Sequence, residues 1–408
     1  MDFTDTPAEA SFRAGARAFL ERHTERLDPG EAPPGPFIGE DPAAVRRSQG
    51  WQALKFDHGW ACLTWPQEYG GRGLGPMEQV IWNQEELRFR TPVNIFSIGI
   101  GMLGPTLMKH GTGEQKRRHL AKMARGDEVW CQLFSEPGAG SDVAGLLTRA
   151  TRDGADWVID GQKTWNTGAH FCRWGVVIAR TDPDVPKHQG LTCFIVDMRS
   201  AGIEVRPIRQ MNGGSGVNDV FFDGVRVPDE NRLGDVDGGW RVAITILMNE
   251  RAAIGARGMA GFGPEDLVRL AREADGPRGK AIEDSAVRAR IADFHVRTAG
   301  LRFTTYRTLT ALSRGETPGP ENAIHKLVGS PLRQRMAALG VELQGPAGAA
   351  MDAAYGAQSA WLAAPGMRLA GGTDEIMRNI IAERVLGLPA EPRVDKELPF
   401  SAMRRNRA

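Results

Sequence analysis

The sequence predicts an α+β chain in three parts: a helical region, a small antiparallel β domain and a second helical region. Apolar residues recur at helical spacing before about Asp127 and again after about Trp240, whereas the stretch between them has short strands separated by turns. The 408 residues are enough for two or three domains. The predicted divisions are an N-terminal helical domain over 1–127, a central β domain over 128–235, a C-terminal helical domain over 236–390 and a tail over 391–408.

The first helical region carries apolar side chains three or four positions apart, for example Phe12, Ala16, Phe19 and Leu20. Within it, residues 99–104 read Gly-Ile-Gly-Met-Leu-Gly and match the Gly-x-Gly-x-x-Gly pattern of dinucleotide sites. Such a site needs a strand before the glycines and another after the helix, and neither is predicted here. We therefore expect these glycines to allow close helix packing.

The middle region is predicted to be all-β because apolar runs follow one another with turns and no helix between them. One run, 157–159, precedes Asp160-Gly161, a dipeptide typical of a β-hairpin turn. These strands are expected to form an antiparallel barrel or sandwich. The other runs are 175–179, 191–196, 203–205 and 220–222.

Helical spacing returns in the third region, in four stretches that end near residue 386. The residues after 393 mix charges with prolines, so no regular element is predicted there. The four stretches are 241–261, 285–312, 331–343 and 373–386.

Composition excludes some classes of function. Lys plus Arg number 51 against 50 Asp plus Glu, whereas nucleic-acid binders concentrate positive charge. The four cysteines lie far apart, which argues against disulfides or a zinc knuckle and favours a cytoplasmic location. Residues 1–10 lack the pattern of a secretory signal, and the longest uncharged stretch, 94–108, is too short for a membrane helix. We expect no nucleic acid and no membrane among the partners.

Searches for familiar catalytic motifs mostly fail. The sequence has no P-loop, no His-Glu-x-x-His zinc site and no Gly-x-Ser-x-Gly elbow. The eight histidines are scattered, so no metal site is predicted.

Residues 134–142, Phe-Ser-Glu-Pro-Gly-Ala-Gly-Ser-Asp, are the first informative segment. The proline and the small residues predict an irregular loop with exposed backbone N–H groups, and Ser135 and Ser141 add hydroxyls. Such a loop suits a phosphate or the edge of a heteroaromatic ring, and a tight interdomain turn is the equal alternative.

The second segment, 161–168, contains Trp165 and Thr167, which are two residues apart and therefore share one side of an extended strand. An indole beside a hydroxyl suits stacking on a ring and hydrogen bonding to its edge. A simple core tryptophan is the alternative.

The third segment is the helix that begins near Arg241 and carries Glu250 on a face with Ile246, Leu247 and Ile254. A carboxylate among apolar neighbours loses hydration and is suited to accept a proton in a dry site. An internal ion pair with a distant Arg or Lys is the alternative.

Together, in this order and on this layout, the three segments resemble the acyl-CoA dehydrogenase family. The resemblance runs from Tyr69-Gly70-Gly71 to residues 380–384. It includes Glu-Pro-Gly-Ala-Gly-Ser-Asp at 136–142, Lys-Thr-Trp at 163–165 and Gly-Gly-Thr-Asp-Glu-Ile at 371–376.

The resemblance implies an N-terminal helical domain, a central β-barrel and a C-terminal four-helix bundle, usually in a homotetramer. It also implies FAD, bound without a Rossmann motif between the barrel and the C-terminal helices. The implied reaction is the α,β-desaturation of an acyl-CoA thioester. In this reaction a carboxylate removes the α-proton, a hydride passes to flavin N5, and an electron-transfer flavoprotein then accepts the electrons.

The same resemblance assigns roles to single residues. Phe134 and Ser135 match positions that touch the isoalloxazine ring, whereas Trp165 and Thr167 match positions that pack on the ring and bond near N5. Ser141 matches a position near the CoA pantetheine and the flavin phosphates.

The C-terminal turn and the base are assigned in the same way. Thr373 and Glu375 match the turn that meets the cofactor, although Thr373 also fits a helix N-cap. Many family members carry a Glu directly before this Gly-Thr, where this chain has Gly371. A second group places its Glu on a middle helix directly before an Arg, as in Glu250-Arg251. Glu250 is therefore the predicted base. Arg251 is predicted to support the carboxylate or the thioester, and a purely structural role is the equal alternative.

Two motifs depart from the family. Its Arg-x-x-Phe-Gly, which reaches the flavin pyrophosphate of a neighbouring subunit, is missing from 275–284. Its Gln-x-x-Gly-Gly-x-Gly, which contacts the adenosine of a neighbouring subunit, becomes Glu-Leu-Gln-Gly-Pro-Ala-Gly at 342–348. A partly degenerate subunit of a mixed tetramer is therefore one alternative, and a flavin monooxygenase or oxidase of the same fold is another. The space at Gly371 suggests a branched or bulky acyl group.

Overall fold

The computed structural model describes most of the chain and divides it into two compact units. The helical unit comprises Met1–Gly35, Leu74–Thr91 and Ile254–Pro389, and the sheet unit comprises Pro36–Gly73, Pro92–Ala253 and Ala390–Ala408. The described residues are 4–28, 41–256, 261–276, 279–314, 316, 319, 323–350, 356–393 and 395–405. Among them, side chains are described for all except 251–256, 309, 312, 313, 404 and 405.

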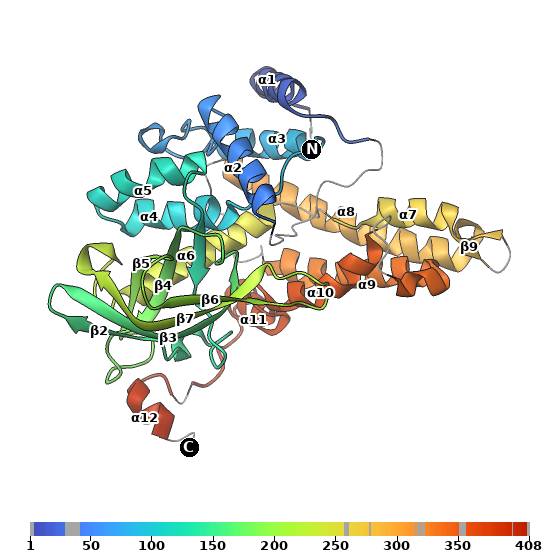
Figure 1. Cartoon of the computed structure of the whole chain (residues 1–408). Helices are drawn as coiled ribbons and strands as arrows, with labels where there is room; N and C mark the ends of the chain where they lie inside the picture. The colour runs from blue at the N-terminus through green and yellow to red at the C-terminus, as the bar shows by residue number, and fades with distance from the viewer. Residues whose placement is uncertain are drawn as a thin grey trace. The chain divides into compact units, whose positions relative to one another are not determined.

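An eight-stranded sheet forms the centre of the sheet unit (Figure 1). Seven strands follow the order β6-β7-β3-β2-β4-β5-β8, and β1 pairs with β4 in parallel. The pairs along the path are antiparallel except the parallel contact of β2 with β4. The strands are β1 (Trp130–Leu133), β2 (Arg149–Asp153), β3 (Asp156–Thr167), β4 (Trp174–Arg180), β5 (Leu191–Asp197), β6 (Ile203–Ile208), β7 (Val217–Pro228) and β8 (Arg232–Leu233).

The predicted order of a helical region, a β domain and a helical region is confirmed, but the sheet is not a closed barrel. Among the described strands, β6 and β8 are the two ends of the path and do not pair with each other. Along the path, β2 and β4 are joined by one residue pair only, Arg149 with Arg180. This single pair divides the path into two halves, β6-β7-β3-β2 and β4-β5-β8. The two halves of the sheet share one apolar cluster instead, which includes Ile159, Val177 and Val225. The sheet thus covers its core by curling and not by closing a ring.

Strand β4 explains why the middle region has continuous apolar runs. All seven of its residues are buried. Val177 faces the cluster shared by the two halves of the sheet, whereas Val176 and Ile178 face a second cluster with residues of the flanking helices. A strand covered on both faces needs apolar side chains at every position and not at alternate ones.

The predicted hairpin turn at Asp160-Gly161 is also wrong, because β3 continues through it. Gly161 has a φ of 147° at a shift in the β3–β7 register, and a Cβ there would lie 2.5 Å from Thr148 Oγ1. Glycine at this point marks a bulge with close backbone approach. The β2–β3 turn lies earlier, at Gly154 and Ala155.

Helices α4 and α5 lie along one side of the sheet (Figure 1). The glycines of 99–104 form a π-helical turn and the start of α4, and a Cβ at Gly104 would lie 2.3 Å from the Trp65 ring. At Gly104 the close neighbour is thus a side chain outside any helix, whereas a Cβ at Gly99 would lie 3.4 Å from Met123 of α5, as expected for close helix packing. The helices of this unit are α2 (Pro42–Asp57), α4 (Gly104–His110), α5 (Gly113–Arg125), α6 (Gly239–Ala256) and α12 (Phe400–Arg405). The part of α6 up to Ala253 belongs to this unit.

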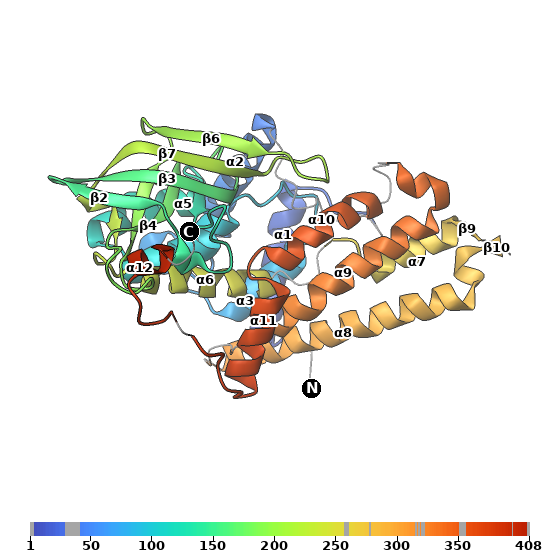
Figure 2. The same cartoon turned by 90° about the horizontal axis from the view of Figure 1, so that it is seen from below.

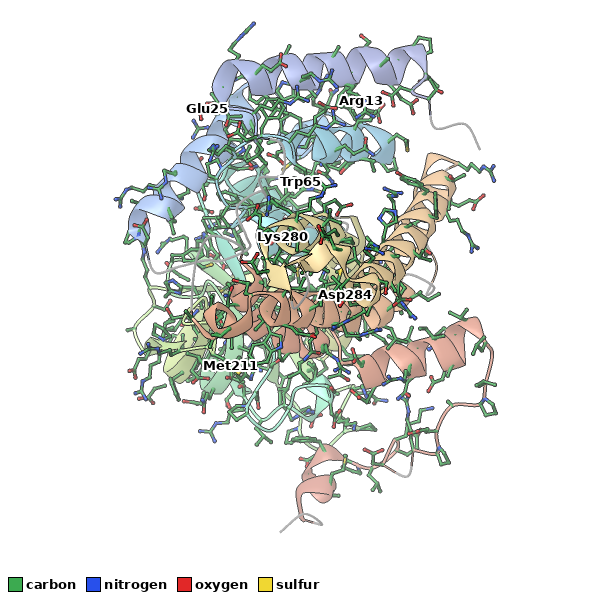
Figure 3. The ribbon with its side chains drawn as sticks, turned by 90° about the vertical axis from the view of Figure 1, so that its right-hand side faces the viewer. Arg13, Glu25, Trp65, Met211, Lys280 and Asp284 are labelled. Carbon is green, nitrogen blue, oxygen red and sulfur yellow. The ribbon has the colours of Figure 1, made fainter. Side chains whose placement is uncertain are left out.

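In the helical unit, α8 and α9 run alongside each other (Figure 2). Arg13 projects from α1 toward α3, where it and Arg17 bind the fully buried Glu85 at 3.2 and 3.0 Å (Figure 3). Among the described helices, none combines the length and apolar character of a membrane span. The helices here are α1 (Pro7–His23), α3 (Pro76–Glu86), α7 (Pro264–Glu273), α8 (Ser285–Ser313), α9 (Ala323–Leu343), α10 (Ala357–Leu369) and α11 (Asp374–Ile380).

Candidate active site

The loop 134–142 and the strand β3 are joined by hydrogen bonds in the sheet unit. The backbone N–H of Thr164 donates to the carbonyl of Ser135 at 2.8 Å. The Lys163 Nζ donates to the carbonyl of Phe134 at 3.1 Å and to Glu136 Oε1 at 2.8 Å. The structure therefore brings together two of the three informative segments.

Glu136 completes this junction inside the protein. Its carboxylate accepts hydrogen bonds from the backbone N–H groups of Leu147 at 2.6 Å and Thr148 at 2.9 Å. Burial opposes ionisation, but the Lys163 ammonium and these donors outweigh it and lower the pKa of Glu136. Because Lys163 is fully buried, the ion pair is shielded from water and fixes the start of the loop.

Trp165 is presented outward in an unusual backbone conformation. Its φ is 60°, in the left-handed region that bulky residues avoid, and its side chain is 60% exposed. The segment is held on either side by buried anchors, Lys163 and Asn166. Asn166 and Asn218 each donate a side-chain N–H to the other's backbone carbonyl, at 3.1 and 2.9 Å. A strained, exposed indole between fixed anchors is typical of a functional position.

The other predicted flavin contacts of this unit differ in exposure. Phe134 is buried, Ser135 and Thr167 are half-buried, and Ser141 is exposed at the far end of the loop. Thr167 follows the exposed Trp165 by two residues, but the β3–β7 register shifts between Lys163 and Asn166 and Trp165 has a left-handed φ. The expectation that Trp165 and Thr167 share one side of a regular extended strand is therefore wrong at this bulge.

Glu250 lies half-buried on α6, one turn after the fully buried Ile246. Ile246 belongs to the same apolar cluster as Phe134. The preceding residue, Asn249, donates to the carbonyl of Met102 at 3.3 Å and to Thr106 Oγ1 at 3.2 Å, which fixes the rotation of the helix. The predicted partner of Glu250, the side chain of Arg251, lies outside the described residues.

Thr373 and Glu375 belong to the helical unit. Lys326 on α9 donates to the carbonyls of Ala370 and Gly372 and so holds the turn before α11. The Thr373 hydroxyl accepts from the N–H of Ile376 at 3.2 Å, which makes Thr373 the N-cap. Glu375 is exposed in the first helical turn, and hydrogen bonds from its own backbone and from Thr373 lower its pKa.

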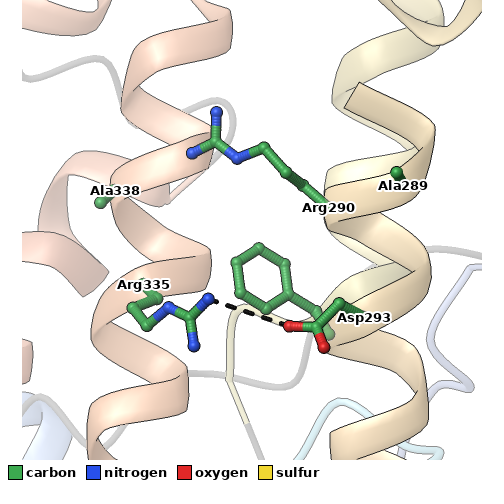
Figure 4. Close-up of a pocket in the computed structure, with 6 residues that line it drawn as sticks. Ala289, Arg290, Asp293, Arg335 and Ala338 are labelled. Atoms are coloured by element: carbon green, nitrogen blue, oxygen red, sulfur yellow. Dashed lines mark ion pairs between the residues drawn. The ribbon is translucent and has the colours of Figure 1, made fainter. Parts of the chain in front are cut away.

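The two departing motifs also lie in the helical unit. The described parts of 275–284 form a short antiparallel pair and a 3₁₀ turn. Glu342 is bound by both terminal nitrogens of Arg290 at 2.9 Å. Arg290 lines a pocket of about 390 Å³ between α8 and α9, where Asp293 and Arg335 form a further ion pair (Figure 4). The carboxylates of Glu342 and Asp293 are thus paired with arginines of the same chain. A side chain that contacted a nucleotide would instead be open to the ligand.

Family comparisons cover almost the whole chain. The acyl-CoA dehydrogenase N-terminal, middle and C-terminal domain models match residues 6–127, 131–225 and 237–386. The chain belongs to the acyl-CoA dehydrogenase family. Its members are oxidoreductases of lipid metabolism that use FAD. The family prediction is thereby confirmed.

Individual relatives agree with this assignment. Acyl-CoA dehydrogenase FadE34 of Mycobacterium tuberculosis is 39% identical over 83% of this chain, and the match spans 46% of the length of FadE34. Acyl-CoA dehydrogenase IpdE1 of the same organism is 36% identical over 86% of this chain and 91% of IpdE1.

Solved structures confirm the predicted fold. The Tcur3481-Tcur3483 steroid ACAD has a TM-score of 0.79 at 29% identity and covers 96% of this chain and 100% of its own. The ChsE4-ChsE5 complex from Mycobacterium tuberculosis has a TM-score of 0.75 at 27% identity, with the same coverage.

The sheet unit fits the isoalloxazine part of FAD. The exposed face of Trp165 offers a surface for a planar ring, and the hydroxyls of Ser135 and Thr167 lie on the segments joined at Lys163. The helical unit fits the adenosine part less well, because Glu342 is occupied by Arg290.

Glu136 and Lys163 lie in the motifs of the sequence analysis, but no role was predicted for either. A buried lysine on a strand needs a partner, so Lys163 in the apolar strand pattern before Trp165 could have indicated a buried ion pair. The partner lies 27 residues earlier, a separation that no local pattern specifies. Asn249 gave no signal, because its partners lie more than 140 residues away.

Proposed function

We propose that this chain catalyses the α,β-dehydrogenation of an acyl-CoA thioester, with Glu250 as the base. The observation that carries the proposal is the half-buried carboxylate on α6, on a helix whose Ile246 shares an apolar cluster with Phe134. This arrangement supports a proton acceptor on a helix that packs on the same apolar core as the loop that fits the flavin ring.

The chemical step assigned to this chain is a proton transfer. Glu250 removes the α-proton of the thioester, and its carboxylate becomes the carboxylic acid. Partial loss of hydration makes a carboxylate a stronger proton acceptor, and Asn249 holds the helix so that the group stays in place. FAD, when bound, supplies the acceptor for the hydride that leaves the β-carbon.

The remaining residues bind and orient. Trp165 packs against the ring, Phe134, Ser135 and Thr167 complete its surroundings, and Ser141 lies toward the pantetheine. Thr373 and Glu375 contribute from the helical unit, and Arg251 supports the thioester end. An electron-transfer flavoprotein is the proposed acceptor, and a homotetramer is the proposed assembly.

The proposed substrate class is a bulky or branched acyl group. Gly371 has no side chain where many family members have a carboxylate, and its φ of 66° favours glycine. A related solved structure, at 29% identity, is described as a steroid ACAD. Both observations support a large acyl group over a short straight one.

An anaerobic titration with a panel of acyl-CoA thioesters tests the proposal. The panel contains short straight, branched and steroid-type acyl groups, and the readout is bleaching of the flavin absorbance. Bleaching by a bulky member supports the proposal, whereas fastest bleaching by short straight chains contradicts the substrate class. A yellow protein that no thioester bleaches contradicts the dehydrogenase step, and oxygen consumption by the reduced protein then identifies the monooxygenase or oxidase alternative.

A second candidate role is a subunit of a mixed tetramer. The Arg290–Glu342 pair favours it, because Glu342 occupies the first position of the family's glutamine motif. Flavin content discriminates between the two. A chain that purifies yellow with one flavin per subunit supports the homotetramer, whereas a colourless chain that binds flavin only with a related partner supports the mixed assembly.

A further inference from the structure

The C-terminal tail, for which the sequence predicted no regular element, docks on the sheet unit. The backbone N–H groups of Phe400 and Ser401 donate to the carbonyls of Val185 and Pro183 at 3.0 and 2.8 Å. The Ser401 hydroxyl also bonds Asp184 at 2.9 Å. Helix α12 therefore lies beside the sheet (Figure 1), on the loop that joins β4 to β5.

An aromatic contact anchors the tail more deeply. The Phe400 ring is buried, and its centroid lies 3.6 Å from the guanidinium carbon Cζ of Arg180. Arg180 is itself buried, and burial lowers its pKa to about 10. Its side chain donates to the carbonyls of Ala144 at 2.6 Å and Leu146 at 3.4 Å. Phe400 of the tail thus covers the guanidinium of Arg180, and Arg180 in turn holds residues 144–146, directly after the 134–142 loop.

An ion-pair bridge joins the tail to that loop itself. Lys187 donates to Asp142 Oδ2 at 3.1 Å and to Asp395 Oδ2 at 3.0 Å, and its side chain is 12% exposed. Asp142 is the neighbour of Ser141, the residue assigned to the pantetheine. Next to Lys187, the ring of His188 packs edge-on against Trp240 in the first turn of α6, the helix of Glu250.

We propose that residues 395–401 are a strap that positions the Ser141 loop through Lys187 and Arg180, and thereby strengthens binding of the CoA part of the substrate. Asp395 and Phe400 are positioning residues, since neither is assigned a contact with substrate or cofactor. The proposal rests on the proposed function in one respect only, the assignment of CoA to the Ser141 end of the loop.

Two variants remove the two anchors separately in the full-length, flavin-loaded protein. Asp395→Asn keeps the shape of the side chain but weakens its bond to Lys187, and Phe400→Ala removes the ring over Arg180. Glu397→Gln is the matched control, because Glu397 is an exposed tail carboxylate for which the described residues provide no ion pair. The readouts are the dissociation constant for CoA itself and amide exchange of peptides that cover 136–148.

The strap predicts faster exchange of 136–148 in both variants, by about tenfold in Phe400→Ala, because this segment then opens more often. CoA binding weakens about three- to fivefold in Asp395→Asn, the range of a partly exposed ion pair, and more in Phe400→Ala. The control stays within twofold of wild type in both measurements.

Unchanged exchange in both variants overturns the strap, and so does faster exchange with unchanged CoA affinity. Because Asp395→Asn is a mild change, its result stands even if Phe400→Ala fails to fold. If wild type binds no CoA at all, the assignment of the Ser141 loop to CoA fails, whereas the exchange data still show whether the tail holds the loop.

Discussion

Replacing Lys163 by Met tests whether a buried ion pair holds the proposed flavin segments together. Methionine has nearly the same length and volume as lysine but no ammonium. The change removes the hydrogen bond to the Phe134 carbonyl and the partner of Glu136, which is itself buried. Breaking a buried pair on one side costs about 3–5 kcal/mol, because an uncompensated charge remains.

The expected loss lies at the lower end of this range, about 3 kcal/mol, since Glu136 keeps its two backbone donors at Leu147 and Thr148. For a unit of this size, about 2–4 °C of Tm corresponds to 1 kcal/mol, so Tm falls by roughly 6–12 °C. The double variant Lys163→Met/Glu136→Gln removes both charges of the pair and regains at least about 1 kcal/mol.

Thermal unfolding of the wild type, the single variant and the double variant measures these differences. Lys122→Met is the matched control, because the Lys122 side chain is 57% exposed and 3.5 Å from Glu128, and it changes stability by less than about 0.5 kcal/mol. A Lys163→Met protein that melts within about 2 °C of wild type would refute the account of the junction.

Three further predictions use other parts of the molecule. Trp165→Gly relieves the left-handed backbone and leaves Tm unchanged or higher, yet weakens FAD binding at least about tenfold; a loss of Tm without a loss of flavin affinity contradicts this. Hydrogen bonds from Arg232 and Trp157 lower the pKa of Asp229 from 3.8 to about 2. Above pH 4 they therefore add about 2 kcal/mol to the free energy of unfolding, and this contribution is lost as the pH falls toward 2. Asp229→Asn therefore lowers Tm at pH 6 more than at pH 3, and an equal loss at both values excludes the linkage. All four cysteines are buried, so a thiol reagent modifies none rapidly in the native protein and four in denaturant, and a fast native reaction counts against the packing.

The order of helices, strands and helices was predictable because it depends on local periodicity, which the sequence carries directly. Sheet closure was not, because it depends on which strand edges meet. Only one residue pair, Arg149 with Arg180, connects the two halves of the path across β2 and β4. At Gly161 a turn signal and a bulge look alike in sequence, and only the approach of Thr148 distinguishes them.

The sequence supplies candidate site residues, which stay a prediction, but not the contacts that surround them. Trp165, Thr167 and Glu250 stand in recognisable motifs. The hydrogen bonds around them span long separations, such as that of Asn249, the neighbour of Glu250, with Met102, 147 residues apart. No pattern within a single helix or strand contains that information.

The most direct test of the account is the rate at which an acyl-CoA substrate reduces the bound flavin in Glu250→Gln, measured anaerobically against wild type. We expect normal flavin content in Glu250→Gln and a reduction rate at least about 100-fold slower, because the carboxylate that takes the α-proton is gone. Reduction at close to the wild-type rate would contradict the assignment of Glu250 as the base.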